Sequence, residues 1–216
     1  MIQGILTLEN SEITDQDYFL TATGSDLTFT NIVYRNTTVT QIMFKVDQSD
    51  MRLTNITLSD FQSSLSDLNM FYLLNTILMV DTMEYSNSNI KLMTAILTTI
   101  DINFVTLKDL AIHSEVMFLR SIQEQGSTID GNTVYSHIKH SSFKSISGNT
   151  LSSVIVSKSD FVSFENVTFI GFVNTPLQIL SSRIRFMKSL YMSNNKSPLK
   201  VQQSVISLIE NSTFEN

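Results

Sequence analysis

The 216-residue chain contains no cysteine, only two prolines and only six glycines. Without cysteine there are no disulfides and no thiolate metal sites, which is more typical of an intracellular or bacterial-surface protein than of a small secreted domain. Because glycine is scarce, left-handed turn positions must be filled by other residues, and asparagine tolerates them best. The first twelve residues, MIQGILTLENSE, have neither a basic region nor a long apolar core, so they do not form a signal peptide.

Long apolar runs and catalytic motifs are also missing. The most apolar run, MFYLLNTILMV at 70–80, has 11 residues and is too short to cross a bilayer, so we expect no direct membrane span. No Ser/His/Asp order, phosphate-binding glycine loop or H-E-x-x-H motif occurs. A net charge of −6 argues against nucleic-acid binding. We therefore predict no catalytic residues, no cofactor, no metal and no nucleic-acid partner.

A short unit recurs along the whole chain, in which an alternating apolar and polar stretch ends in a turn. Four copies read NIVY, NITL, NVTF and NSTF, at 31–34, 55–58, 166–169 and 211–214. Aligning the copies on the last apolar residue of each gives steps of 21 to 36 residues. These nine anchors are Ile13, Tyr34, Leu58, Tyr85, Leu107, Phe143, Phe169, Met192 and Phe214.

Positions outside the alignment anchor support the same register. The residue five before each anchor is apolar in all nine copies, which predicts one inner column along the molecule. This core column consists of Leu8, Phe29, Leu53, Val80, Ile102, Ile138, Phe164, Met187 and Ile209. The residue seven before the anchor is apolar in six copies, while Ser136, Arg185 and Ser207 break the pattern.

A unit of 20-odd residues with short β segments cannot bury its apolar face alone and needs neighbours on both sides. It is too short for a propeller blade and lacks the leucine-rich-repeat pattern. We predict an all-β fold, a right-handed parallel β-helix (β-solenoid) of about eight to nine coils, with strands about 4.8 Å apart. Residues 1–216 form a single solenoid with a loop insertion near 121–133. We also expect it to be part of a longer solenoid or to have its ends covered by partners.

Asparagine recurs three residues before the anchor. An amide ladder at this position would satisfy buried turn groups that water does not reach. The ladder consists of Asn10, Asn31, Asn55, Asn166 and Asn211. His140 takes the same position in its coil, where we expect a structural role. On a strand, His137 and His140 would point to opposite faces, which argues against shared metal ligation.

Five N-x-[ST] sequons occur, and each would accept a glycan on an exposed position of a secreted eukaryotic protein. Those at Asn36 and Asn195 lie outside the ladder, whereas Asn55, Asn166 and Asn211 belong to it and would be turned inward. The alternative is that a chain with 30 Ser, 23 Thr and 17 Asn contains sequons by chance.

Charge is unevenly distributed. Residues 1–34 contain five carboxylates and no Lys or Arg, and residues 166–209 contain five basic residues and no Asp or Glu. The resulting acidic and basic ends favour head-to-tail self-association. Asp26 and Asp50 occupy the same repeat position and would stack on successive coils. Such a pair could bind a cation, although a repeated turn-capping role is the simpler interpretation.

The stretches ITLSDF at 56–61, FENVTFIGF at 164–172 and IENSTFEN at 209–216 resemble coils of right-handed parallel β-helix proteins of the pectin-lyase-like superfamily. FKSISGNTLSSVIVSKSDF at 143–161 is similar in layout to repeats of polymorphic outer-membrane adhesins and of long ciliate surface β-helix proteins. The GGA[ILV] tetrapeptide of the bacterial adhesins is replaced by SGNT at 147–150. The resemblance implies the fold but no particular activity.

Three interpretations of function remain. The preferred one is a non-catalytic structural or adhesive solenoid at the cell surface or outside the cell, with a protein or glycan partner. The alternatives are a carbohydrate-active module that uses Asp26 and Asp50, and an intracellular scaffold subunit of a larger assembly. The residues of pectin-hydrolysing members, an NTD triplet, an Asp-Asp pair and a GHG histidine, are absent, although inverting hydrolysis needs an acid and a base.

Overall fold

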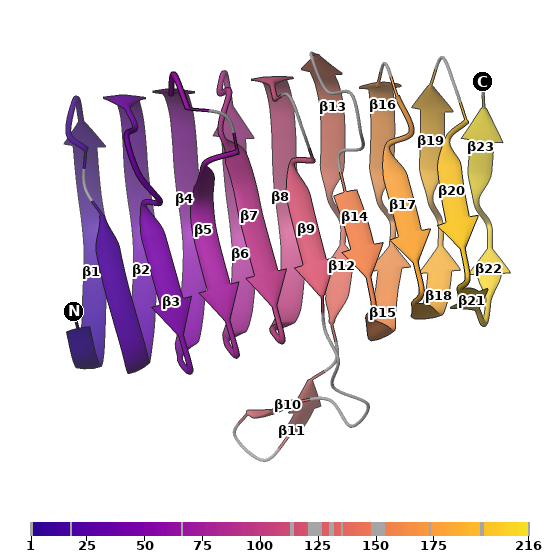
Figure 1. Cartoon of the computed structure of the whole chain (residues 1–216), viewed down its shortest axis with the longest axis horizontal. Helices are drawn as coiled ribbons and strands as arrows, with labels where there is room; N and C mark the ends of the chain where they lie inside the picture. The colour runs from indigo at the N-terminus through magenta and orange to yellow at the C-terminus, as the bar shows by residue number, and fades with distance from the viewer. Residues whose placement is uncertain are drawn as a thin grey trace.

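The chain winds into a stack of β-strand coils that runs from the N-terminus at one end to the C-terminus at the other (Figure 1). The computed structural model describes residues 2–17, 19–65, 67–112, 115–120, 127–129, 132–134, 136–147, 154–172, 174–194 and 197–215. Within these ranges every regular element is a β-strand. No helix in this described part is long and apolar enough to cross a membrane.

The strands of the first five coils are β1 (Ile2–Thr14), β2 (Leu20–Thr38), β3 (Phe44–Asp47), β4 (Asp50–Gln62), β5 (Asn69–Leu74), β6 (Ile77–Ser86), β7 (Lys91–Ile96) and β8 (Thr99–Ala111). Five of them, β1, β2, β4, β6 and β8, are 10 to 19 residues long because each runs through a corner of the coil without interruption.

The later strands are shorter. They are β9 (Met117–Arg120), β10 (Ser127–Ile129), β11 (Asn132–Val134), β12 (His137–Lys139), β13 (Ser142–Ser147), β14 (Val154–Ser157), β15 (Asp160–Glu165), β16 (Thr168–Phe172), β17 (Leu177–Leu180), β18 (Arg183–Lys188), β19 (Tyr191–Asn194), β20 (Leu199–Gln202), β21 (Val205–Ile206), β22 (Ile209–Glu210) and β23 (Thr213–Glu215).

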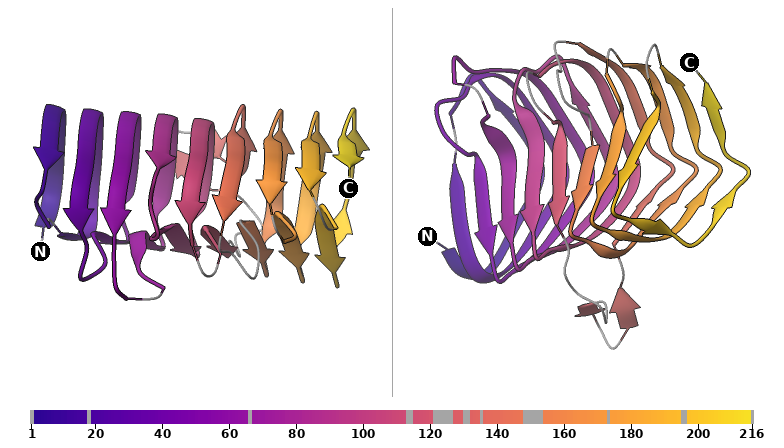
Figure 2. Two further views of the ribbon diagram at one scale, coloured as in Figure 1. Left: turned by 90° about the horizontal axis from the view of Figure 1, so that it is seen from above. Right: turned by 45° about the vertical axis from the view of Figure 1, so that its right-hand side comes forward.

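Every coil pairs in parallel with the next, and the pairs form three faces around one apolar core (Figure 2). Face 1 contains residues 20–23 with β3, β5, β7, β9, β14, β17 and β20. Face 2 contains the first halves of β1, β4, β6 and β8, residues 26–30, and β12, β15, β18, β21 and β22. Face 3 contains the second halves of the long strands with β13, β16, β19 and β23. The parallel β-solenoid predicted from the repeats is confirmed.

The strand register reproduces the repeat alignment. All nine anchors, from Ile13 to Phe214, pair residue to residue on face 3.

Arg185, which interrupts the apolar column seven residues before the anchor, does so for a local reason. The register of β15 with β18 shifts after Val162, which pairs with Ile184, so the buried side chain is Ile184 while Arg185 is exposed. A β-bulge of this kind moves one residue out of the column.

The nine residues of the core column also pair coil by coil, on face 2. The seven from Phe29 to Met187 are buried, at 6% exposure or less. Leu8 is only partly buried and Ile209 is 49% exposed, although strand pairing aligns both with the buried column. Both lie in coils that have a neighbour on one side only within the structure, and burial of this face requires a coil on each side.

The corner between face 2 and face 3, here the second corner, is left-handed in every coil. All nine residues have φ between 48° and 67°: Asn10, Asn31, Asn55, Thr82, Phe104, His140, Asn166, Ser189 and Asn211. Five of the nine are asparagine, which bonds locally and tolerates this region better than other L-residues.

The amide ladder forms at this corner, but on the outside. The Nδ2 of Asn31 donates to Oδ1 of Asn10 at 2.8 Å, and the Nδ2 of Asn55 donates to Oδ1 of Asn31 at 2.8 Å. All five ladder asparagines are exposed. The prediction that they hydrogen-bond buried turn groups is therefore wrong, and so is the inward placement of Asn55, Asn166 and Asn211. A left-handed residue at the corner directs its side chain outward while its successor packs inward.

Buried hydroxyls line the corner between face 1 and face 2, here the first corner. Each follows a left-handed residue where that residue is described, as Ser49 follows Gln48 and Ser182 follows Ser181. Most members are 6% exposed or less, and the partly buried Ser204 completes the row of Ser25, Ser49, Thr76, Thr98, Ser136, Ser159, Ser182 and Ser204.

These hydroxyls satisfy backbone groups of neighbouring coils. Ser182 Oγ donates to the Leu180 carbonyl at 2.7 Å and accepts from the backbone N–H of Ser159 at 3.1 Å. Ser49 Oγ makes the same two contacts, with the Asp47 carbonyl at 2.7 Å and the Ser25 N–H at 3.1 Å. The hydrogen bonds to backbone groups that the sequence assigned to asparagine are therefore made by serine and threonine, mostly at a different corner. At the second corner Ser141 makes the same two contacts, with the Val105 N–H and the Lys139 carbonyl.

The predicted insertion near 121–133 lies largely outside the described residues. Within it, β10 and β11 pair antiparallel, and Figures 1 and 2 draw this hairpin outside the coil stack. Coil pairing resumes at β12, which lies between β8 and β15.

Candidate functional site

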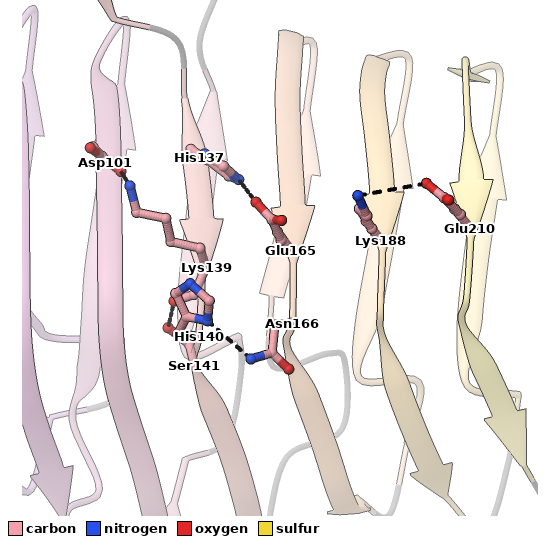
Figure 3. Close-up of polar contacts among 9 residues, drawn as sticks. All are labelled: Asp101, His137, Lys139, His140, Ser141, Glu165, Asn166, Lys188 and Glu210. Atoms are coloured by element: carbon pink, nitrogen blue, oxygen red, sulfur yellow. Dashed lines mark hydrogen bonds and ion pairs between the residues drawn. The ribbon is translucent and has the colours of Figure 1, made fainter.

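The outer surface of face 2 carries two rows of chemically varied side chains. Alternation along each strand turns Ile138 inward, and therefore turns His137 and Lys139 outward. One row runs through Asp101, His137, Ser163 and Phe186, and the other through Asn103, Lys139, Glu165, Lys188 and Glu210. We call these two rows the charged face (Figure 3).

Ion pairs link successive coils of the charged face. Lys139 Nζ lies 3.2 Å from Asp101 Oδ1, and Lys188 Nζ lies 3.8 Å from Glu210 Oε2. Each pair joins strands of adjacent coils, which cross-strand neighbours of opposite charge allow. The side chains are about 28% to 46% exposed, so solvent screens these pairs and their stabilising contribution is small.

His137 is the most enclosed ionisable side chain of the charged face, at 23% exposure. Its Nε2 lies 3.6 Å from Glu165 Oε2, and its ring meets Phe186 edge-on at 5.5 Å. The small, buried Ser163 separates His137 from Phe186 in the row and leaves room for this contact. Partial burial lowers the pKa of His137 below its usual value, and the nearby Lys139 ammonium lowers it further. The imidazole is therefore neutral at neutral pH.

The second corner continues the charged face. Phe104 and His140 stack there with ring centroids 5.1 Å apart and an interplanar angle of 19°. Asn166 Nδ2 donates to His140 Nδ1 at 3.0 Å. His137 and His140 both lie on the outer surface, because the chain turns at His140, so their predicted placement on opposite faces is wrong.

Asp26 and Asp50 are register partners on neighbouring coils. They line a shallow cavity of ≈ 440 Å³ at the first corner, together with Gln48, Asn75 and Thr76. The side-chain set is rich in oxygen, but within the described ranges no three His, Asp or Glu residues form a group that could hold a metal ion.

A second cavity, of ≈ 480 Å³, is apolar and opens at the first coil. Core residues such as Phe29, Phe44 and Phe71 line it, and Phe19, which is 62% exposed, lies at its edge. This cavity is the apolar interior of the solenoid seen from the first coil.

The remaining sequence-predicted residues are placed as follows. Asn36 is exposed and left-handed, with φ of 55°, on the corner between face 3 and face 1. Asn195 lies outside the described residues.

The repeat alignment did not identify the charged face, since outward positions carry no common residue type from coil to coil. The hydroxyl row did leave a signal, because Ser25, Ser49, Thr76 and Thr98 all stand nine residues before an anchor.

Comparisons with known proteins return folds rather than a family. No family model matches the chain, and no curated protein matches it. Three solved structures are similar over most of the chain. The A-module of the mannuronan C-5 epimerase AlgE4 of Azotobacter vinelandii is 12% identical, with a TM-score of 0.33 over 98% of this chain and 76% of that one.

The other two are a plasmid-mediated fluoroquinolone resistance protein and a pentapeptide repeat protein. QnrB1 is 10% identical, with a TM-score of 0.26 over 95% of this chain and 91% of that one. HetL of Nostoc sp. strain PCC 7120 is 7% identical, with a TM-score of 0.21 over 97% and 87%. Similarity at this level assigns no activity, and the fold assignment depends on the strand pairing described above.

Proposed function

We propose that the protein is a non-catalytic structural or adhesive solenoid that presents its charged face to a glycan or an extended protein partner, at the cell surface or outside the cell. The observation that carries the proposal is the register of the charged face. Lys139, Glu165 and Lys188 lie on successive coils, so polar groups recur at the strand spacing along a flat surface. An extended ligand that lies along the stack, such as a glycan chain, meets a polar side chain at each step.

Fixed side chains favour this use of the charged face. Lys139 is paired with Asp101 and Lys188 with Glu210, so binding freezes less side-chain motion than it would on free lysines. The neutral His137 adds a hydrogen-bonding ring, and Phe186 adds apolar area beside it.

A binding comparison tests the proposal. The purified chain is applied to immobilised glycans and to whole cells, beside a triple variant with Lys139→Gln, Glu165→Gln and Lys188→Gln. We expect the triple variant to lose most of the retained protein. Lys45→Gln is the matched control, because Lys45 is exposed on face 1. Equal retention of the wild-type chain and the triple variant would exclude the charged face as the binding surface.

Head-to-tail association is a second part of the proposal. Four carboxylates lie in the first coil, including Glu9 and Asp17, and the last two coils carry five Lys and Arg residues against two carboxylates, Glu210 and Glu215. Opposite charge at the two ends would align copies along one axis. Sedimentation at low and high salt tests this, with self-association expected only at low salt.

A carbohydrate-active module is the alternative, favoured by the cavity that Asp26 and Asp50 share. Two carboxyl groups on neighbouring coils supply the two groups that an acid–base pair needs. A polysaccharide degradation screen of the wild-type chain and of Asp26→Asn tests it. Activity that disappears in Asp26→Asn would replace the non-catalytic proposal.

Compartment is tested separately. For the proposed extracellular location in a eukaryote, the exposed Asn36 is the first acceptor to examine. A mass shift on glycosidase treatment that Asn36→Gln abolishes supports the surface location. A chain without attached glycans from its native source favours the intracellular scaffold.

A further inference from the structure

One residue of the second corner is large and apolar, unlike the other eight. Phe104 has φ of 53°, a conformation in which the Cβ crowds the backbone and which bulky residues rarely adopt. It is also 52% exposed, the only large apolar side chain of its coil that the structure exposes within the described residues. Asparagine, which five of the nine coils have here, would avoid both costs. Strained residues of this kind cluster at binding and catalytic sites.

The groups around Phe104 define what it could bind. His140 covers one side of the Phe104 ring, while the corner residue of the preceding coil is the short, exposed Thr82, which leaves half of Phe104 in solvent. Because Asn166 donates its amide N–H to His140 Nδ1, Nδ1 is the acceptor and Nε2 carries the ring N–H. The exposed corner therefore combines an apolar ring with a hydrogen-bond donor.

The neighbouring charges exclude one class of ligand. Carboxylates flank Thr82 in the chain, and both have partners: Asp81 Oδ1 accepts from Asn103 Nδ2 at 3.1 Å, and Glu84 Oε1 lies 2.6 Å from Lys108 Nζ. Asn103 is uncharged, so its hydrogen bond does not neutralise Asp81, and the remaining negative charge repels an acidic ligand. An uncharged ligand with an apolar face and hydroxyl groups matches the corner better, since paired carboxylates still accept hydrogen bonds from hydroxyls.

We infer that Phe104 and His140 form a binding site for a neutral sugar ring, with the C–H face of the sugar against Phe104 and its hydroxyls bonded to His140 Nε2–H and the Asp81 carboxylate. This inference rests on the proposed function and narrows it to a glycan and to one position along the solenoid. The charged face, whose Lys139 and Asn103 lie next to the corner, would carry the rest of the glycan chain.

Phe104→Asn is the decisive variant because it restores the residue that the corner favours. Removing the strain should raise the midpoint of thermal unfolding, so lost binding cannot be attributed to misfolding. The probes are short neutral oligosaccharides from glucan, mannan, xylan and galactan, with oligogalacturonate as the acidic counterpart. We expect a neutral probe to bind the wild-type chain and Phe104→Asn to weaken that binding about tenfold. Phe104→Tyr keeps the ring and should retain it.

The outcomes separate the site from the function. If the wild-type chain and Phe104→Asn bind a neutral probe equally well, the site is overturned while glycan binding by the solenoid stands. If only oligogalacturonate binds, the assignment to a neutral sugar is overturned. If no probe binds but the charged-face variant loses cell retention, the inference is overturned and the proposed function stands with a protein partner. A lower unfolding midpoint for Phe104→Asn would contradict the strain argument.

Discussion

The first and second corners turn the chain in the same way, yet their polar side chains lie mainly inside the solenoid at the first corner and outside it at the second. Both place a residue in the left-handed region in coil after coil. At the first corner the following residue is a buried hydroxyl, such as Ser182, whose bonds replace water for backbone groups. At the second corner the following residue is apolar in most coils, such as Ile32. The side-chain amide bonds belong there to the left-handed residue and lie in solvent, as for Asn31 and Asn55, and Ser141 is the buried exception. The difference indicates that the inner hydroxyls contribute more to stability than the outer amides.

Removing an inner hydroxyl should give the largest effect. Ser182→Ala leaves the buried Ser159 N–H and the Leu180 carbonyl without that partner, and we expect a loss of about 1–3 kcal/mol in the free energy of unfolding. Chemical denaturation measures this loss. Ser182→Thr is the control, since Thr76 and Thr98 occupy equivalent positions. A Ser182→Ala variant as stable as the wild type would remove the basis of the comparison.

The outer corner should respond mainly through its backbone. Asn55→Ala keeps a β-carbon at φ of 54° but removes the side-chain amide that makes this conformation tolerable. We expect the free energy of unfolding to fall by about 1–2 kcal/mol. Asn55→Gly accepts this φ freely and loses only the amide contact, so its cost should be smaller. Equal denaturation midpoints for the two variants would show that the amide ladder, rather than the turn conformation, sets the stability of this corner.

The hydroxyl row itself should show a gradient. Ser204 bonds to the Gln202 and Ile179 carbonyls at 2.8 and 3.2 Å, but it is only partly buried. Water can replace some of the hydrogen bonds of Ser204, so Ser204→Ala should lower the free energy of unfolding by roughly 0.5–1 kcal/mol. A cost equal to that of Ser182→Ala in the same denaturation series would contradict the dependence on burial.

The charged face should give the smallest effect, and only in acid. The lowered pKa of His137 means that the unfolded chain binds a proton more readily than the folded chain. Stability from this group is thus present above the usual histidine pKa of about 6.5 and declines as the pH falls below it. The charged neighbours are Asp101, Lys139 and Glu165.

Unfolding curves at several pH values measure this term. His137→Gln should lose less stability on acidification than the wild type does, whereas parallel curves for the two proteins would exclude His137 as the source.

The sequence predicted the fold because burial repeats. Every coil places apolar residues at the anchor and five before it, so a single alignment identifies both columns, Ile13 to Phe214 and Leu8 to Ile209. The sequence could not predict whether the side chains at the corners point into the solenoid or out of it. Asparagine at a turn bonds equally well inward or outward, and only the path of the chain through the corner decides.

The repeat alignment also does not reveal the hydroxyl row. Ser159, Ser182 and Ser204 stand ten residues before their anchors rather than nine, so the row is broken in a rigid alignment. A register shift between β15 and β18 lies in this part of face 2. The charged face and the Phe104 corner depend on which outward side chains meet across coils, which periodicity alone does not encode.

An engineered disulfide tests the stacked register most directly, because the chain has no cysteine of its own. Thr30 and Thr54 are register partners on the outside of face 2, at a strand spacing of about 4.8 Å that a disulfide can bridge. We predict that Thr30→Cys with Thr54→Cys oxidises within one chain, while Thr30→Cys with Arg52→Cys, two residues out of register on the same face, does not. Efficient oxidation of the second pair and failure of the first would contradict the solenoid described here.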